Sequence, residues 1–157
     1  MGDLKIGKIP LGDINLIKFN PNKGKHMKVV DYLRDKTAVD MCYDVYQDVD
    51  ALKKDTLMGN PYLVKKNDDF IGYMYISDEF DGERILAYII DKKLRGKGLG
   101  KVMLTSVGDY LFEHCGTSTI KLYINKNNTQ GINLALGCGF YRTNITDGIL
   151  EGYNKNK

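Results

Sequence analysis

Six consecutive residues near the middle of the chain, Arg95-Gly96-Lys97-Gly98-Leu99-Gly100, have the composition of an anion-binding turn. Glycines at alternate positions let the main chain approach a ligand closely and leave several N–H groups pointing the same way. A helix that begins at such a turn adds the positive end of its dipole. Together these features predict a phosphate-binding loop.

The spacing excludes two common phosphate-binding motifs. A nucleoside-triphosphate loop has four residues between its glycines, followed by Lys-Ser/Thr, and a dinucleotide-binding loop has a glycine where this chain has Lys101. An ordinary strand-to-helix turn is the alternative for an isolated G-x-G-x-G pattern. The elements on either side of the turn therefore decide between the two interpretations.

These flanking segments predict a strand, a helix and a second strand. Residues 85–90 carry no charge, which is typical of a central strand covered on both faces. Residues 99–114 repeat apolar side chains at helical spacing, and residues 119–125 alternate as a half-buried strand. Because the helix is too long for a hairpin connection, the order predicts a right-handed parallel crossover.

The remaining patterns predict a mixed sheet, antiparallel in its first part. Residues 14–19, 62–66, 70–76 and 148–153 favour strands, and residues 137–142 lead into a further strand. Residues 26–35, 37–52 and 130–136 favour helices. Residues 5–9 form either an extension of the sheet or a tail, and we expect residues 154–157 to be a loose tail. The fold class is thus α/β with a mixed central sheet, with about six to seven strands and about four helices.

The length of 157 residues, without an internal repeat or a low-complexity linker, predicts a single domain over residues 1–157. Hydrophobic residues make up 43% and charged residues 27%, as in an ordinary globular protein, and the net charge of +3 is too small to indicate a nucleic-acid partner. Three widely spaced cysteines predict neither a disulfide framework nor a metal site. We expect a cytoplasmic protein without a membrane partner, since no segment resembles a signal peptide or a transmembrane helix.

The glycine-rich loop resembles motif A of the GNAT N-acyltransferase superfamily. Asn128 and the pair Gly139-Phe140, which follow the second strand, strengthen this resemblance, which runs from about Ile85 to Tyr141. It implies the GNAT fold, acetyl-CoA (CoA) as the cofactor, and direct transfer of an acetyl group to an amine. The acceptor would be an amine of a small molecule, a peptide or a protein. We expect the protein to be a monomer or a homodimer.

The resemblance assigns most site residues to cofactor binding. Main-chain amides of the loop would hold the pyrophosphate, with positive charge from Arg95, Lys97 or Lys101, and the strand end at Ile89 and Ile90 would contact the pantetheine arm. Asn128 would contact the cofactor and also cap a helix. The expected cofactor-binding residues are Ile89, Ile90, Arg95, Gly96, Lys97, Gly98, Leu99, Gly100, Lys101 and Asn128.

Acid and base catalysts are harder to assign. Glu83 lies near the position where many relatives carry a general base, and the alternatives are a turn carboxylate without a catalytic role or a chain of water molecules. Family members often protonate the departing thiolate with a tyrosine four residues before the Gly-Phe pair, where this chain has Ala135. Tyr123, Tyr141 or water would then have to replace it.

The acceptor is not evident from these motifs. One face of a predicted helix would carry three carboxylates, Asp40, Asp44 and Asp48. They either form a solvated acidic face without a binding role or attract a cationic amine substrate. A second hypothesis is a non-catalytic module that binds acyl-CoA, and Ala135 is the residue that favours it.

Overall fold

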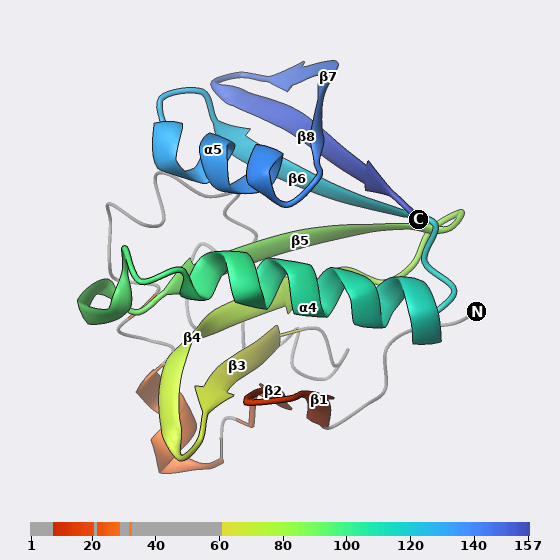
Figure 1. Ribbon diagram of the computed structural model, residues 1–157. Coiled ribbons are helices and arrows are strands. Elements are labelled where there is room, and N and C mark those ends of the chain that lie inside the picture. Colours follow the sequence, from red (N-terminus) through yellow and green to blue (C-terminus); the bar gives the residue numbers. More distant parts are fainter. Residues whose placement is uncertain (1–7, 21, 29–31, 33–60) are drawn as a thin grey trace.

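The computed structural model describes residues 8–20, 22–28, 32 and 61–157 of the chain. This part forms one mixed sheet with two α-helices and two short 3₁₀ helices (Figure 1). The strands lie in the order β1-β2-β3-β4-β5-β6-β8-β7. Their bounds are Lys8–Leu11 (β1), Ile14–Lys18 (β2), Pro61–Lys66 (β3), Asp69–Ile76 (β4), Glu83–Ile90 (β5), Thr119–Asn125 (β6), Tyr141–Asp147 (β7) and Leu150–Asn156 (β8).

Strands β1 to β5 form an antiparallel meander in sequence order. Residues 67–68 make the tight turn between β3 and β4, and Asn67 has the positive φ of 55° that short hairpin turns require. The sequence left residues 5–9 open as an extension of the sheet or a tail; residues 8–9 belong to β1, and residues 5–7 lie outside the described residues. With β1, the described residues contain eight strands. Its Pro10 is tolerated because β1 lies at the edge of the sheet.

The connection from β5 to β6 is the parallel crossover that the sequence predicts. Strand β5 leads into the 3₁₀ helix η2 (Lys92–Leu94), then into the glycine-rich loop, and then into helix α4 (Leu99–His114). The predicted and observed bounds of α4 agree, because its apolar residues recur at helical spacing along the whole segment.

The C-terminal part of the chain corrects one prediction. After helix α5 (Thr129–Gly137), β7 forms the edge of the sheet, and β8 returns between β6 and β7. Residues 154–157 are therefore not a loose tail, because β8 continues to Asn156 and pairs it with Thr119. The amide of Lys157 also donates to the carbonyl of Ser118 at 2.9 Å.

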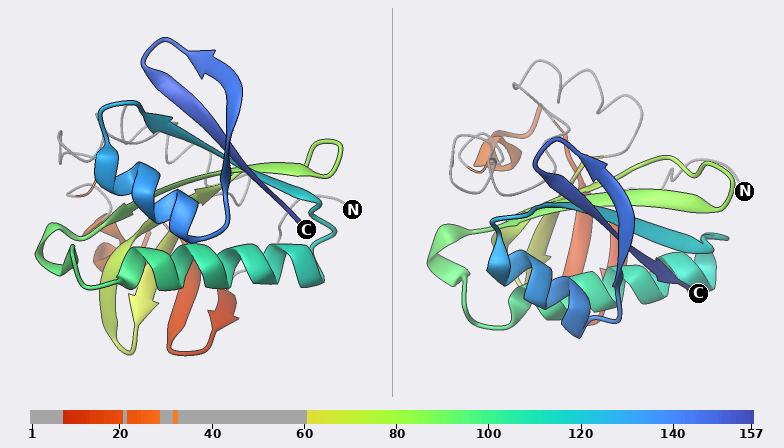
Figure 2. Two further views of the ribbon diagram at one scale, coloured as in Figure 1. Left: turned by 45° about the horizontal axis from the view of Figure 1, so that its top comes forward. Right: turned by 90° about the horizontal axis from the view of Figure 1, so that it is seen from above.

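One large hydrophobic core lies between the sheet and the two helices, which cover the same side of it (Figure 2). Helix α4 contributes Met103 and Val107, and the strands contribute Leu86 and Leu122, all nearly inaccessible to solvent. Burying each such side chain contributes roughly 1.5–3 kcal/mol to folding. This core holds β5, α4 and β6 in fixed relative positions.

The predicted N-terminal helices are only partly described. Residues 24–28 form a 3₁₀ helix, η1 (Gly24–Lys28), where the sequence predicts the start of an α-helix at His26. The predicted helix over 37–52, with Asp40, Asp44 and Asp48, lies outside the described residues, so two of the expected four helices are observed. Within the described residues, no helix combines the length and apolar character needed to cross a bilayer.

Candidate active site

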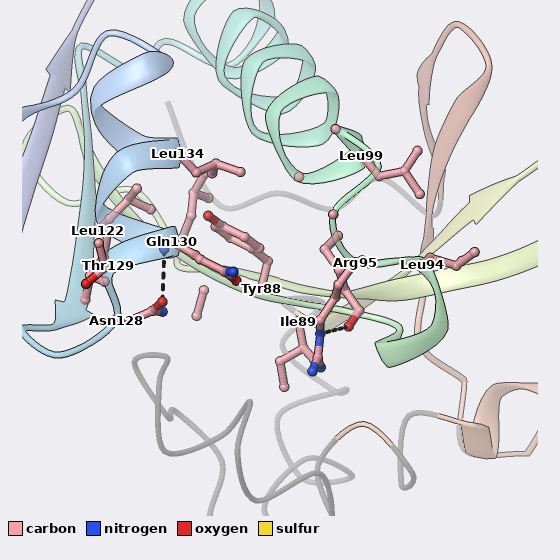
Figure 3. A pocket seen from close by; sticks show the side chains of 18 of the residues that line it. Tyr88, Ile89, Leu94, Arg95, Leu99, Leu122, Asn128, Thr129, Gln130 and Leu134 are labelled. Carbon is pink, nitrogen blue, oxygen red and sulfur yellow. Dashed lines mark hydrogen bonds between the residues drawn. The ribbon is translucent and has the colours of Figure 1, made fainter.

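A cavity of about 750 Å³ lies where β5 and β6 separate (Figure 3). The glycine-rich loop and the first turn of α4 border it on one side, and the first turns of α5 border it on the other. The lining residues are Leu86, Ala87, Tyr88, Ile89, Ile90, Leu94, Arg95, Gly96, Gly98, Leu99, Gly100, Leu122, Tyr123, Ile124, Asn127, Asn128, Thr129, Gln130, Gly131 and Leu134. Most of these side chains are apolar, and polar groups gather at the two helix starts.

The opening follows from a short strand ladder. β5 and β6 pair only over three residue pairs, from Glu83 with Thr119 to Ile85 with Lys121. The lining residues of both strands begin at the next position, Leu86 on β5 and Leu122 on β6. The two strand edges therefore diverge beyond the ladder, and the cavity occupies the space between them.

The register of β5 against β4 determines which peptide groups face the cavity. The amide of Asp91 donates to the carbonyl of Ile71 at 2.8 Å, so residues an even number of positions before Asp91 also direct their peptide groups to β4. Tyr88 and Ile90 have the opposite parity and direct theirs toward the cavity. Consistently, the Arg95 side chain donates from Nε to the carbonyl of Ile90 at 3.0 Å.

The glycine-rich loop enters α4 through two residues in the left-handed region. Gly96 has a φ of 78° and Gly98, the N-cap residue, a φ of 79°. The first helical bond joins the amide of Val102 to the carbonyl of Gly98, so the amides of residues 99–101 precede the hydrogen-bonded ladder. Three of the loop glycines line the cavity, which brings the positive end of the α4 dipole to it.

Asn128 forms the opposite border at the start of α5. Its Oδ1 accepts a hydrogen bond from the amide of Gly131 at 2.9 Å, as expected of an N-cap residue. Asn127 and Gln130 stand beside it in the cavity wall. The predicted cap is therefore observed, and the same residue lies next to the cavity.

The structure brings most of the predicted cofactor residues together. All of those named from the sequence line the cavity except Lys97 and Lys101. These two lysines are exposed and lie on the loop and on the first turn of α4.

Glu83 is not brought to the cavity. It is the first residue of β5 and lies in the closed ladder, roughly 20 Å along the strand from Ile90. Its Oε2 lies 2.6 Å from Nζ of Lys121. The hydrogen bond from this pair raises the pKa of Lys121 above its usual value.

The sequence also left open which tyrosine could approach the reaction centre. Tyr123 lines the cavity, whereas Tyr141 lies outside it, about half exposed, and accepts a hydrogen bond from Asn156 Nδ2 at 3.2 Å. Ala135 is completely buried in the core. Tyr88 was not predicted, although its position two residues before Ile90 on an alternating strand was a usable signal.

On the other side of β5, a hydrogen bond connects its end to the N-terminal segment. Tyr32, which is 5% exposed, donates from its hydroxyl to Oδ2 of Asp91 at 3.2 Å. Asp91 Oδ1 also accepts from the amide of Lys93 at 3.0 Å and so caps η2. Asp91, which directly follows β5, is thereby bonded both to Tyr32 and to the start of η2.

The fold is shared with known acetyltransferases. A GNAT-family acetyltransferase from Bacillus anthracis has a TM-score of 0.76 at 16% identity, over 95% of this chain and 98% of that chain. Spermidine N-acetyltransferase from Vibrio cholerae, in complex with CoA and spermine, has a TM-score of 0.75 at 16% identity, over 92% of this chain and 95% of that chain. At these identities the similarity shows the fold alone.

A third protein with this fold acts on a protein substrate. It is an acetyl transferase from Salmonella typhimurium that modifies the N-terminal serine of the 50S ribosomal subunit protein L7/L12. Its TM-score is 0.74 at 13% identity, over 96% of this chain and 99% of that chain. No curated protein sequence matches the chain.

A family match covers more than half of the sequence. Residues 29–140 match the family described as the acetyltransferase (GNAT) family, and this range includes β3 to β6, α4, α5 and the glycine-rich loop. The chain therefore belongs to the acetyltransferase (GNAT) family.

Proposed function

We propose that the protein transfers an acetyl group from acetyl-CoA directly to an amine of a small molecule, a peptide or a protein. The observation that carries the proposal is the cavity between the diverging edges of β5 and β6, with the N-terminal turn of α4 at its border. Membership of the acetyltransferase family supports the same reaction.

The cavity walls fit the chemical parts of CoA. The diphosphate is anionic, and the amides of the glycine-rich loop with the α4 dipole offer donors and positive potential. The pantetheine arm carries amide groups, and the peptide groups of Tyr88 and Ile90 face the cavity. We assign the diphosphate to Gly96, Gly98 and neighbouring amides, with Lys97 and Lys101 adding positive charge from outside the cavity wall.

The chain's own contribution to the reaction is to orient and polarise. Bound acetyl-CoA supplies an activated acetyl group as a thioester. We propose that the peptide N–H of Ile90, directed into the cavity, donates a hydrogen bond to the carbonyl oxygen and so stabilises the charge that develops there. Because Glu83 lies in the closed ladder, we assign deprotonation of the amine to water rather than to this carboxylate.

For the acceptor we propose a cationic amine. Asp40, Asp44 and Asp48 recur every four residues, a spacing that would place their negative charges together, and negative charge attracts polyamines and the N-termini of basic peptides. The Vibrio cholerae protein is a spermidine N-acetyltransferase, and the Salmonella typhimurium protein modifies the N-terminal serine of a ribosomal protein. Both acceptor classes therefore belong in the first assay.

A second candidate function is binding of acyl-CoA without turnover. The observation that favours it is Ala135, a buried residue that offers no proton donor on α5. A pure binding module would be stabilised by acetyl-CoA and would release no CoA.

One experiment separates the two functions. Release of CoA thiol is measured with acetyl-CoA and a panel containing spermidine, lysine, a basic peptide with a free N-terminus and its N-acetylated form, together with the melting temperature. Enzymatic acetyl transfer predicts amine-dependent release and stabilisation by acetyl-CoA. Stabilisation without release from any amine supports the binding module, and the absence of both contradicts each proposal.

A further inference from the structure

Transfer of an acetyl group leaves a sulfur atom that must gain a proton, and the cavity offers few side chains able to give one. Asparagine, glutamine and threonine do not release protons near neutral pH, and the guanidinium of Arg95 stays charged. Among the residues that line the cavity, two tyrosines remain, Tyr88 on β5 and Tyr123 on β6. Assigning a proton donor presupposes the proposed acetyl transfer. The geometry of the two strands then distinguishes between the two tyrosines.

The two tyrosines lie on opposite faces of the sheet. On β6, Leu122 and Ile124 belong to the core beneath α4 and α5, so the intervening Tyr123 points to the other face. On β5, Tyr88 packs against that same core, as do its even-numbered neighbours. Figure 3 shows the Tyr88 ring directed from β5 toward the side of the cavity that α5 forms.

Tyr88 also belongs to the strand edge that faces the cavity. Its own peptide group and that of Ile90 point into the space between the strands, so a cofactor arm bound along this edge passes next to the Tyr88 side chain. The ring is half-buried, and apolar Leu134 lies across the cavity on α5. A hydroxyl held in place beside the leaving sulfur can give its proton without recruiting a water molecule from solvent.

We infer that Tyr88 is the catalytic acid. As the amine nitrogen bonds to the carbonyl carbon, the carbon–sulfur bond breaks, its electron pair goes to sulfur, and the Tyr88 hydroxyl gives its proton to that sulfur. The nitrogen loses a proton to water and Tyr88 regains one from water. The net products are the acetylated amine and the CoA thiol, so protons and electrons balance.

The test compares Tyr88→Phe with Tyr123→Phe, since each removes one oxygen atom from a tyrosine of the same cavity. Tyr88→Phe is expected to lower kcat about 100-fold, the lower end of the usual range for a general acid, with little change in the KM for acetyl-CoA. Tyr123→Phe is expected to lower kcat much less than Tyr88→Phe does, because Tyr123 lies on the other face of the sheet. The matched control is Tyr141→Phe, because Tyr141 lies outside the cavity, and this variant is expected to stay within about threefold of the wild type. A large loss in Tyr123→Phe alone, or unchanged kcat in Tyr88→Phe, overturns the assignment.

A binding measurement tests the contact without turnover. The wild type is expected to bind CoA more tightly than desulfo-CoA, and Tyr88→Phe is expected to reduce that ratio while Tyr123→Phe preserves it. If Tyr88→Phe does not fold, the wild-type ratio still decides, because equal affinities would exclude a contact between this hydroxyl and sulfur. Failure of the wild type to release CoA with any amine would instead contradict the proposed function.

Discussion

Gly98 directs the main chain from the glycine-rich loop into α4 with a φ of 79°. A Cβ at this position would meet no atom within 4 Å, so the position restricts side chains through backbone strain rather than through lack of space. A side chain here would also project beside the amides that we assign to the diphosphate. Effects of strain and of charge can therefore be separated with two substitutions of similar size.

We predict that Gly98→Asp weakens acetyl-CoA binding far more than Gly98→Asn does. Both side chains tolerate the left-handed conformation to a similar degree, but only aspartate adds a negative charge next to a bound diphosphate. Isothermal titration with acetyl-CoA measures the difference, and circular dichroism shows whether both variants are folded. Equal affinities of the two variants would remove the diphosphate from this loop.

Gly72 on β4 has the opposite restriction, lack of space. A Cβ there would lie 2.4 Å from the main-chain oxygen of Ile89, so only glycine lets β4 approach the end of β5. Gly72→Ala is expected to shift this strand end, lower kcat, and reduce the free energy of unfolding by about 1–3 kcal/mol, the usual cost of overpacking.

A second glycine provides the control for this substitution. Gly108 lies within α4, where a Cβ would make an ordinary 3.5 Å contact with Ile120, so Gly108→Ala should stabilise the protein by up to about 1 kcal/mol. Chemical denaturation and steady-state kinetics on both variants measure the difference. If Gly72→Ala is as stable and active as the wild type, the tight contact does not position β5.

At the scale of the element, helix α5 starts directly after Asn128, a residue to which we assign two roles. Asn128 caps the helix through its Oδ1, and we propose that the same side chain contacts the cofactor. Asn128→Ala should lower the free energy of unfolding by about 1 kcal/mol and weaken CoA binding as well. Aspartate keeps the capping oxygen but loses the amide N–H donors.

Asn128→Asp therefore separates the two roles. Because aspartate caps helices as well as asparagine does and interacts favourably with the helix dipole, its melting temperature should match that of the wild type. Its CoA affinity should fall nonetheless, as titration calorimetry would show. Wild-type affinity in this variant would leave capping as the sole role of Asn128.

Elements with a strong local signal were predictable from the sequence. The apolar spacing of α4 and the uncharged run in β5 each depend on one segment burying its own side chains. Strand β8 was missed at its end, because the polar residues 154–156 become strand only through pairing with β6. Residues 26–28, the last three of η1, were predicted as the start of an α-helix, since short 3₁₀ turns have no distinct apolar period.

The site was predictable to the same extent. A loop that binds through main-chain amides needs glycines for its backbone conformation, and glycines are visible in the sequence. The position of this loop was therefore clear from residues 95–100. The location of Glu83 depends on where β5 stops pairing with β6, and the orientation of Tyr88 depends on the register against β4. Both are properties of strand pairing between distant segments, which a single sequence specifies only weakly.

For the whole molecule, the acid stability is expected to depend on His26. This side chain is 5% exposed, lies between Phe19 and Phe70, and accepts the amide of Asn20 on Nδ1 at 2.9 Å. Burial, followed by the charges of Lys23 and Lys65, lowers the pKa of His26 below its usual value of 6.5. The folded protein thus favours the neutral imidazole, whose Nδ1 lone pair accepts the hydrogen bond from the Asn20 amide.

We predict that stability decreases as the pH falls below 6.5. In that range the unfolded chain takes up a proton that the folded protein does not, so the free energy of unfolding falls with pH until His26 is also protonated in the folded state. His26→Asn, which keeps an acceptor but does not titrate, should flatten this decline. Urea unfolding at several pH values measures it, and parallel curves for both proteins would contradict the prediction.

The short ladder between β5 and β6 has a practical consequence for handling the protein. Beyond three residue pairs, two strand edges face each other across the cavity without joining, and such edges are sites at which a second molecule can add. A ligand carrying amide groups would occupy them. We therefore expect purified stocks to precipitate more slowly during storage when CoA is included in the buffer, and light scattering over several days would measure the benefit.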